Sequence, residues 1–247
     1  MAEQYDLATI LGRSPAEPEV GSAVRQSDVT QLIELLKRSR SEAEQAHLDT
    51  VRRLARAAEY KDDQTGMHLE RMSRYCRILA RRAGMSPARC ELLFAAAPMH
   101  DVGKIGVPDA ILLKPGPLTG DEFEVMKTHT LIGADLLSEG KAAVIRLART
   151  VALTHHERYD GLGYPQGLQG EDIPLEGRIA SLADVFDALT TVRPYKRAFS
   201  VKYAVDLIRQ DRGLRFDPWL VDVFLEAMPE IKETRTRWLS DDESIGG

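Results

Sequence analysis

The chain has 247 residues, which is long enough to bury a sizeable core without disulfides or other staples. It carries 33 Lys plus Arg against 38 Asp plus Glu, and this formal charge of -5 argues against a general nucleic-acid-binding surface. No run approaches the roughly 18 apolar residues of a membrane helix, and the N-terminus lacks the basic and apolar regions of a signal peptide. Two cysteines, Cys76 and Cys90, show no metal-type spacing, so we expect them to pack in the core of a protein in a reducing cytoplasm.

The first 60 residues divide into two parts. Residues 1–27 contain Gly and Pro with little periodicity, so we expect a poorly ordered leader. Apolar residues then recur at helical spacing, and no Gly or Pro occurs between Asp28 and Thr65. We interpret 28–60 as one long linker helix, or two helices end to end. The stripe from Val29 to Leu54 favours pairing with a second copy in a homodimer, although packing on its own core is the alternative.

Helical periodicity continues almost to the C-terminus and predicts an all-α fold. No convincing alternating strand occurs, and two loops rich in Gly and Pro, 106–120 and 160–177, interrupt the pattern. Asp217 is placed to cap the helix that begins with Pro218. The last residues, 239–247, are expected to fray. The predicted helices cover 69–85, 121–137, 141–156, 176–192, 201–210 and 216–228.

Five of the six histidines gather between residues 68 and 156 of the chain. His100 precedes an Asp, and the pair His155–His156 precedes a Glu. Successive members are separated by about one helix and a turn, so each helix can deliver one or two ligands to a shared centre. Mixed imidazole and carboxylate donors suit Fe, Mn, Zn or Ni, and two such ions can activate a water for phosphoryl displacement. His47 lies mid-helix among polar residues and is excluded from this set.

Long ordered motifs make the pattern specific. His100–Asp101 with Asp184 downstream has the form H…HD…D of the HD-superfamily phosphohydrolases. The segments "HDVGKIGVPDAILLKPGPLT", "HHERYDGLGYPQGLQGEDIP" and "RIASLADVFDALTTVRPYKRA" closely resemble the HD-GYP family of bacterial cyclic di-GMP phosphodiesterases. The resemblance runs over 46–238, which overlaps the end of the linker helix. It implies an HD-domain helical bundle with a GYP loop, acting on cyclic di-GMP, mainly to linear pGpG, with a metal-activated water.

The resemblance also implies roles for particular residues. It implies two divalent ions, most simply Fe or Mn, with Asp101 as the bridging ligand. Asp101 and Lys104 match catalytic positions of the family. Lys104 follows Asp101 by three residues, so on a helix the two side chains would share one face. Asp187, Arg158 and Arg178 fit catalysis or structural ion pairs equally well. The implied metal ligands are His68, His100, Asp101, His129, His155, His156 and Asp184, and the implied substrate contacts are Tyr164, Pro165, Arg193 and Lys196.

Two positions depart from the family pattern. Gln64 stands where a Glu often precedes His68, which puts a third ion in doubt. Pro98 interrupts the helix before His100, and we expect a local kink there. Two other functions stay open: the same scaffold acting on another cyclic dinucleotide or nucleotide phosphoester, and a non-catalytic nucleotide-binding module with a signalling-protein partner.

Overall fold

The computed structural model describes residues 26–61, 66–192 and 198–245. Within these ranges no strand occurs, and the isolated bridge between Arg212 and Phe216 is the β-pairing found, which confirms the all-α prediction. The chain divides into two compact units, 1–47 and 48–247, and the boundary falls inside α2. In chain order the helices are α2 (Gln26–Tyr60), α3 (Gly66–Arg82), α4 (Pro87–Ala96), η1 (Ala97–Met99), η2 (Val102–Gly106), α5 (Asp109–Leu112), α6 (Gly120–Lys127), α7 (His129–Leu136), α8 (Ala143–Thr154), η3 (Gly170–Asp172), α9 (Leu175–Thr190), α10 (Val201–Gln210) and α11 (Pro218–Ile245).

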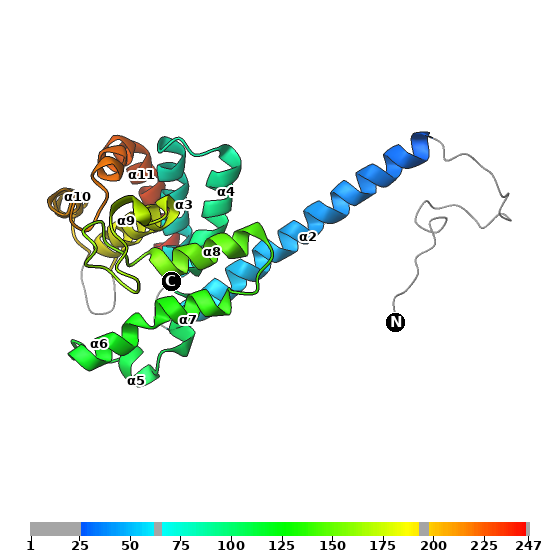
Figure 1. Cartoon of the computed structure of the whole chain (residues 1–247). Helices are drawn as coiled ribbons and strands as arrows, with labels where there is room; N and C mark the ends of the chain where they lie inside the picture. The colour runs from blue at the N-terminus through cyan, green and yellow to red at the C-terminus, as the bar shows by residue number, and fades with distance from the viewer. Residues whose placement is uncertain (1–25, 62–65, 193–197, 246–247) are drawn as a thin grey trace. The chain divides into compact units, whose positions relative to one another are not determined.

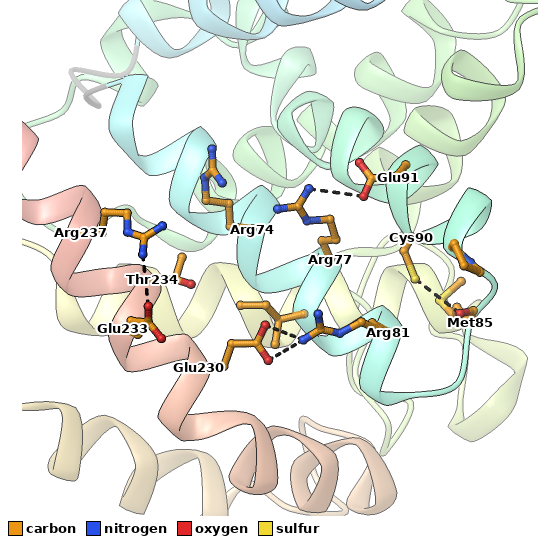
Figure 2. Close-up of a pocket in the computed structure, with 12 residues that line it drawn as sticks. Arg74, Arg77, Arg81, Met85, Cys90, Glu91, Glu230, Glu233, Thr234 and Arg237 are labelled. Carbon is orange, nitrogen blue, oxygen red and sulfur yellow. Dashed lines mark hydrogen bonds and ion pairs between the residues drawn. The ribbon is translucent and has the colours of Figure 1, made fainter.

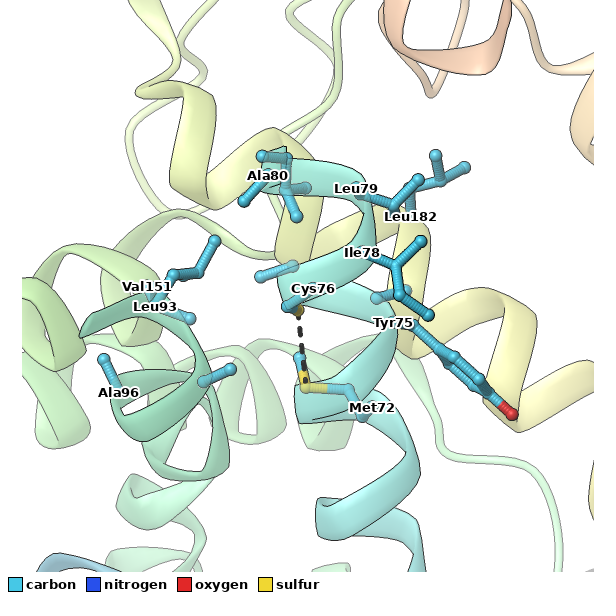
Figure 3. Packing of buried hydrophobic residues seen from close by; sticks show 14 of the residues in the cluster. Met72, Tyr75, Cys76, Ile78, Leu79, Ala80, Leu93, Ala96, Val151 and Leu182 are labelled. Carbon is cyan, nitrogen blue, oxygen red and sulfur yellow. Dashed lines mark hydrogen bonds between the residues drawn. The ribbon is translucent and has the colours of Figure 1, made fainter. Parts of the chain in front are cut away.

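The core of the second unit forms around α3. This helix packs against α4, α9 and α11, while α8 packs against α4, α7 and α9 (Figure 1). Met72, Cys76 and Leu79 recur at helical spacing and are fully buried, and Leu93 of α4 and Leu182 of α9 meet them (Figure 3). Fully burying one such side chain stabilises the fold by about 1.5–3 kcal/mol. The core thus holds at a fixed spacing the helices whose ends carry the histidines.

Cys76 and Cys90 are both free and buried. Cys76 donates to the Met72 sulfur at 3.9 Å (Figure 3). Burial raises the pKa of both thiols above the ordinary value. A raised pKa suppresses the reactive thiolate, so their packing role agrees with the expectation from sequence.

The helix ends differ from the prediction where side chains compete with the backbone. We expected a single helix over 121–137, but α6 ends at Lys127 and α7 begins at His129. The Thr128 hydroxyl donates to Val125 O at 2.6 Å, and the Thr130 hydroxyl donates to Lys127 O at 2.9 Å. These bonds take up carbonyls of the preceding turn. The break places His129 at the start of a new helix.

The end of α4 and the start of α11 lie where a proline and an aspartate in the sequence predict helix boundaries. α4 ends at Ala96 and the chain continues as the 3₁₀ turn η1, which contains Pro98, so the predicted interruption before His100 is present. Asp217 accepts from the backbone N–H of Trp219 at 2.8 Å, which confirms the predicted cap of α11. α11 continues to Ile245, so most of the segment that we expected to fray is helical. The sequence contains no Gly or Pro between Pro229 and Gly246 that would end the helix earlier. Across the described residues, no helix combines the length and apolar composition needed to cross a bilayer.

Candidate metal centre

Two groups of side chains within the described residues meet the geometric needs of a metal ion. His68, His100 and Asp184 form one group, in which the donor atoms lie within 4.8 Å of one another. The second group satisfies the same limit and comprises Asp101, His129, His155 and His156. All seven residues implied as ligands by the sequence motifs therefore fall into these two groups.

Asp101 joins the two groups. Its Oδ2 lies 3.2 Å from Nε2 of His100 in the first group. Its Oδ1 lies 3.3 Å from Nε2 of His129 and 3.5 Å from Nε2 of His155 in the second. The two oxygens of a single carboxylate thus face opposite halves of the cluster, which is the arrangement that a bridging ligand needs.

Four of the five imidazoles in the two groups are anchored through Nδ1. His68 Nδ1 lies 2.8 Å from Asp187 Oδ2, and His129 Nδ1 lies 2.7 Å from Met126 O. The Nδ1 atoms of His100 and His155 lie 3.1 Å from backbone carbonyls one turn earlier. Each of these partners accepts a hydrogen bond, so Nδ1 carries a proton and Nε2 is the nitrogen available to a metal.

Unpaired buried atoms support the same conclusion. The Nε2 atoms of His68 and His100 and the Oδ1 atom of Asp101 are buried and make no hydrogen bond with any described residue. Leaving a buried polar group unpaired costs about 1–3 kcal/mol, and a metal ion would satisfy all three. The residues present therefore fit a metal-binding cluster.

Charged residues of the cluster shift the pKa values of their neighbours. Burial disfavours a charge on Asp101, but the Lys104 ammonium and His100 hold the pKa of that carboxyl well below its usual range. Burial also works against a charged His100, yet the Asp101 carboxylate raises its pKa to about 9. Burial lowers the pKa of His129 to about 4 and lowers that of His156 as well, which keeps both imidazoles neutral. Neutral imidazole and ionised carboxylate are the protonation states that bind metals, so His100 has to give up a proton when it binds an ion.

Asp187 and Arg71 support the His68 side of the cluster. Arg71 Nε donates to Asp187 Oδ1 at 2.8 Å and its Nη2 donates to Oδ2 at 3.0 Å. Both side chains are almost completely buried. Burial opposes the charge on Asp187, but His68 and Arg71 lower its pKa. Sequence analysis left Asp187 between two roles, and the geometry makes it the residue that orients His68.

Lys104 and the tight turn after Asp101 shape the other side of the carboxylate. Lys104 belongs to the 3₁₀ turn η2, which directly follows Asp101. Its Nζ lies 2.7 Å from Asp101 Oδ2. A side chain at Gly103 would place Cβ 1.9 Å from His129 O. Only glycine lets η2 approach α7 this closely, so Gly103 brings Asp101 within reach of His129.

The loop 160–177, called the GYP loop after Gly163, Tyr164 and Pro165, covers the second group of ligands. The Tyr164 ring stacks on His156, with ring centroids 4.8 Å apart and planes 29° from parallel. Glu157 anchors the loop by accepting the backbone N–H groups of Gln166 at 2.7 Å and Leu168 at 3.0 Å. A Cβ at Gly163 would lie 2.3 Å from the Arg158 backbone nitrogen, so glycine is required there. Pro165 follows Tyr164 through a cis peptide bond.

Other candidates from the sequence lie elsewhere. Gln64, Arg193 and Lys196 fall outside the described residues, and so does the side chain of His47. Arg158 pairs with Asp160, whose Oδ1 also accepts from Leu162 N, so this ion pair shapes the loop. Arg178 donates to Asp217 at the start of α11 and serves the fold rather than the cluster.

Three residues near the cluster were not predicted as site residues from the sequence. Glu59 of α2 is only 6% exposed, and burial raises its pKa to about 7 although His68 and His100 act to lower it. Lys127 Nζ lies 5.6 Å from the Tyr164 ring centroid. Arg215 acts electrostatically on both His156 and Tyr164. None of the three belongs to a motif with the spacing of metal ligands. For Glu59, the feature of the sequence that could have indicated burial was its position on the apolar stripe of its helix.

A pocket of about 410 Å³ lies at α3, α4 and α11, apart from the histidines. Figure 2 shows three ion pairs among its charged lining residues: Arg81 with Glu230, Arg77 with Glu91, and Arg237 with Glu233. Because it shares no residue with either ligand group, this pocket is not the candidate active site.

Comparison with known proteins agrees with the site. The sequence model of the HD domain family matches residues 51–220 of this chain. The chain is 48% identical over 195 residues to the cyclic di-GMP phosphodiesterase response regulator RpfG of Xanthomonas campestris pv. campestris, covering 79% of this chain and 52% of the relative. It is 40% identical over 182 residues to the 3'3'-cGAMP-specific phosphodiesterase 2 of Vibrio cholerae, covering 74% of this chain and 35% of the relative.

A solved structure shares the fold. The cyclic GMP-AMP-specific phosphodiesterase V-cGAP3 of V. cholerae superimposes with a TM-score of 0.59 at 22% identity, over 78% of this chain and 50% of that one. The chain belongs to the HD domain family, in its HD-GYP branch, which confirms the resemblance in the motifs. It spans about half the length, or less, of the curated relatives described here.

Proposed function

We propose that this chain is a metal-dependent phosphodiesterase that hydrolyses cyclic di-GMP. The observation that carries the proposal is Asp101, whose two carboxylate oxygens face separate groups of ligands while Lys104 holds it ionised. The 48% identity to a cyclic di-GMP phosphodiesterase supports the substrate. We propose two ions, Fe or Mn before Zn or Ni, because the donors are mixed imidazole and carboxylate.

Some of the site residues would hold the metal ions, and others would contact the substrate. Two divalent ions would supply Lewis-acid stabilisation of the phosphoryl group and a water nucleophile active at neutral pH. The anchored imidazoles and Asp101 hold the donor positions without reorganisation. Lys104 can donate to a non-bridging phosphate oxygen. Tyr164, beside Lys127 and Arg215, forms the substrate side of the cluster, and Pro165, Arg193 and Lys196 are proposed contacts on the same side.

We propose linear pGpG as the main product. Gln64 brings no charge where a carboxylate could hold a third cation, so the extra phosphate of pGpG would be poorly neutralised for a second cleavage. Chromatography of a time course with Mn²⁺-loaded protein tests this. Accumulation of pGpG is expected, with Gln64→Glu raising GMP yield; rapid GMP formation by the unmodified chain would contradict the product assignment.

A second candidate substrate is another cyclic dinucleotide. The 40% identity to a 3'3'-cGAMP-specific enzyme favours it, since the same cluster can open either ring. Parallel kcat/KM values for cyclic di-GMP and 3'3'-cGAMP decide between them. A non-catalytic role is less consistent with the cluster, because all five cluster histidines and both aspartates lie in ligand-competent positions.

The cellular setting is also a proposal. Val29, Ile33 and Leu36 of α2 are exposed apolar side chains, which supports a homodimer through the N-terminal helix, or contact with a signalling-protein partner. A cytoplasmic location suits a nucleotide second messenger as substrate. No nucleic-acid polymer and no membrane partner are proposed.

A further inference from the structure

Glu59 is a buried carboxylate without a partner. Both of its side-chain oxygens are inaccessible to solvent and make no hydrogen bond with any described residue. An ionised carboxylate in such surroundings is strongly disfavoured unless a cation or donors compensate it. The packing of α2 does not require an acid here, because Ala55 and Ala58 on the same face are buried and apolar. A carboxyl group at this position therefore either takes up a proton or stays ionised beside something positive.

The surroundings of Glu59 point to the metal centre. The groups that act on it electrostatically are His68, His100, Asp101 and Lys104, which belong to the cluster or contact it. Two of these residues, His68 and His100, are the ones whose Nε2 atoms are also buried and unpaired. Unpaired donors for a cation and an unpaired anion thus occur in one region of the molecule.

An independent contact fixes the end of α2 beside the cluster. Lys61, two residues after Glu59, donates through Nζ to Ile105 O at 2.9 Å and to Val107 O at 2.7 Å. These carbonyls lie in and just after η2, the turn that carries Lys104. The last turn of α2 is therefore tied to the same segment that follows Asp101, and Glu59 is held there rather than at a free helix end.

We propose that Glu59 is an additional carboxylate ligand for the ion held by His68, His100 and Asp184. In the structure its oxygens do not share the 4.8 Å spacing of those three donors, so a change of its side-chain rotamer has to bring it to the ion. With the bridging Asp101, this ion has four protein donors, which leaves open positions on an octahedral ion such as Mn²⁺, and a further carboxylate offsets more of its charge. The proposal rests on the metal centre and not on the identity of the substrate. A test without nucleotide therefore separates its failure from failure of the proposed phosphodiesterase activity.

The test compares metal-free and Mn²⁺-loaded full-length protein. In Glu59→Gln the metal-free Tm is expected to stay equal or rise, because an unpaired buried charge is removed. The Mn²⁺-induced rise in Tm is expected to shrink, and Mn²⁺ binding, counted by electron paramagnetic resonance of the free ion, should weaken at least tenfold. Glu59→Met, of similar volume and apolar, should behave in the same way and provides a second folded variant.

Glu176→Gln is the matched control. Glu176 is also a buried carboxylate, but it accepts a hydrogen bond from Arg89 at 2.7 Å and belongs to neither ligand group. Its substitution should lower the Tm of both forms equally and leave Mn²⁺ affinity unchanged. If both Glu59 variants bind Mn²⁺ like the unmodified chain, the proposal is overturned. A lower metal-free Tm with an unchanged Mn²⁺ response would also overturn it, because Glu59 would then serve only the fold.

Discussion

Asp187→Asn tests whether the metal centre depends on the residues behind its ligands. The substitution keeps the shape of the side chain but removes the charge that Arg71 and His68 share. Arg71 is fully buried and keeps a hydrogen bond to Thr191 Oγ1 at 3.1 Å. Removing one partner of a buried pair costs about 3–5 kcal/mol, and the isosteric amide should place the loss at the lower end.

The expected shifts follow from these contacts. For a domain of this size, a loss of 1 kcal/mol lowers the Tm by about 2–4 °C, so a loss near 3 kcal/mol corresponds to roughly 6–12 °C. His68 would lose the carboxylate that fixes its Nδ1 proton, and loss of such a partner weakens metal binding about 10–100-fold. Differential scanning calorimetry of the metal-free protein and a Mn²⁺ titration measure the two effects separately.

The double variant Asp187→Leu with Arg71→Met separates stability from metal binding. Replacing a whole buried ion pair by apolar residues is often neutral or stabilising, so the Tm should recover while Mn²⁺ affinity stays low. Asp217→Asn is the control, because Asp217 also pairs with a partly buried arginine, Arg178, but lies in neither ligand group. The reasoning is refuted if Asp187→Asn binds Mn²⁺ as tightly as the unmodified chain, or if the double variant restores affinity together with stability.

The remaining predictions concern the bridge, the substrate and assembly. Asp101→Ala should abolish hydrolysis and lower bound metal measured by plasma mass spectrometry, whereas His47→Ala should do neither; full turnover with unchanged metal in Asp101→Ala would remove the bridging role. Arg193→Ala should weaken binding of cyclic di-GMP, measured by titration calorimetry, by about 1.5–3 kcal/mol, the worth of a charged hydrogen bond. The metal content measured by plasma mass spectrometry should stay unchanged; lost metal with intact affinity would assign Arg193 to the cluster instead. The full chain should be a dimer by light scattering and a version starting at residue 44 a monomer; a monomer in both cases at high concentration would rule out pairing through α2.

The sequence by itself determined the fold class, the family and the candidate ligands. Helical spacing and the Gly and Pro content of two loops were enough for an all-α fold, because these signals are local. The motifs around His100 and His155 were specific enough to identify HD-GYP, because a metal cluster requires particular donors at each helix end. Asp217 was correctly predicted as a cap for the same local reason.

Only the tertiary structure decided which side chains share an environment. The break between α6 and α7 depends on hydroxyls that take carbonyls from the preceding turn, and periodicity does not register such competition. Asp187 meets His68 across 119 residues of sequence, so its role as orienting carboxylate rather than surface ion pair could not be read from spacing. Glu59 is the clearest case: α2 carries many charged residues, so one more Glu is ordinary in the sequence, and only its burial beside His68 and His100 makes an unpaired carboxylate significant. The physical reason is that desolvation depends on what the folded chain packs around a group, not on its neighbours in sequence.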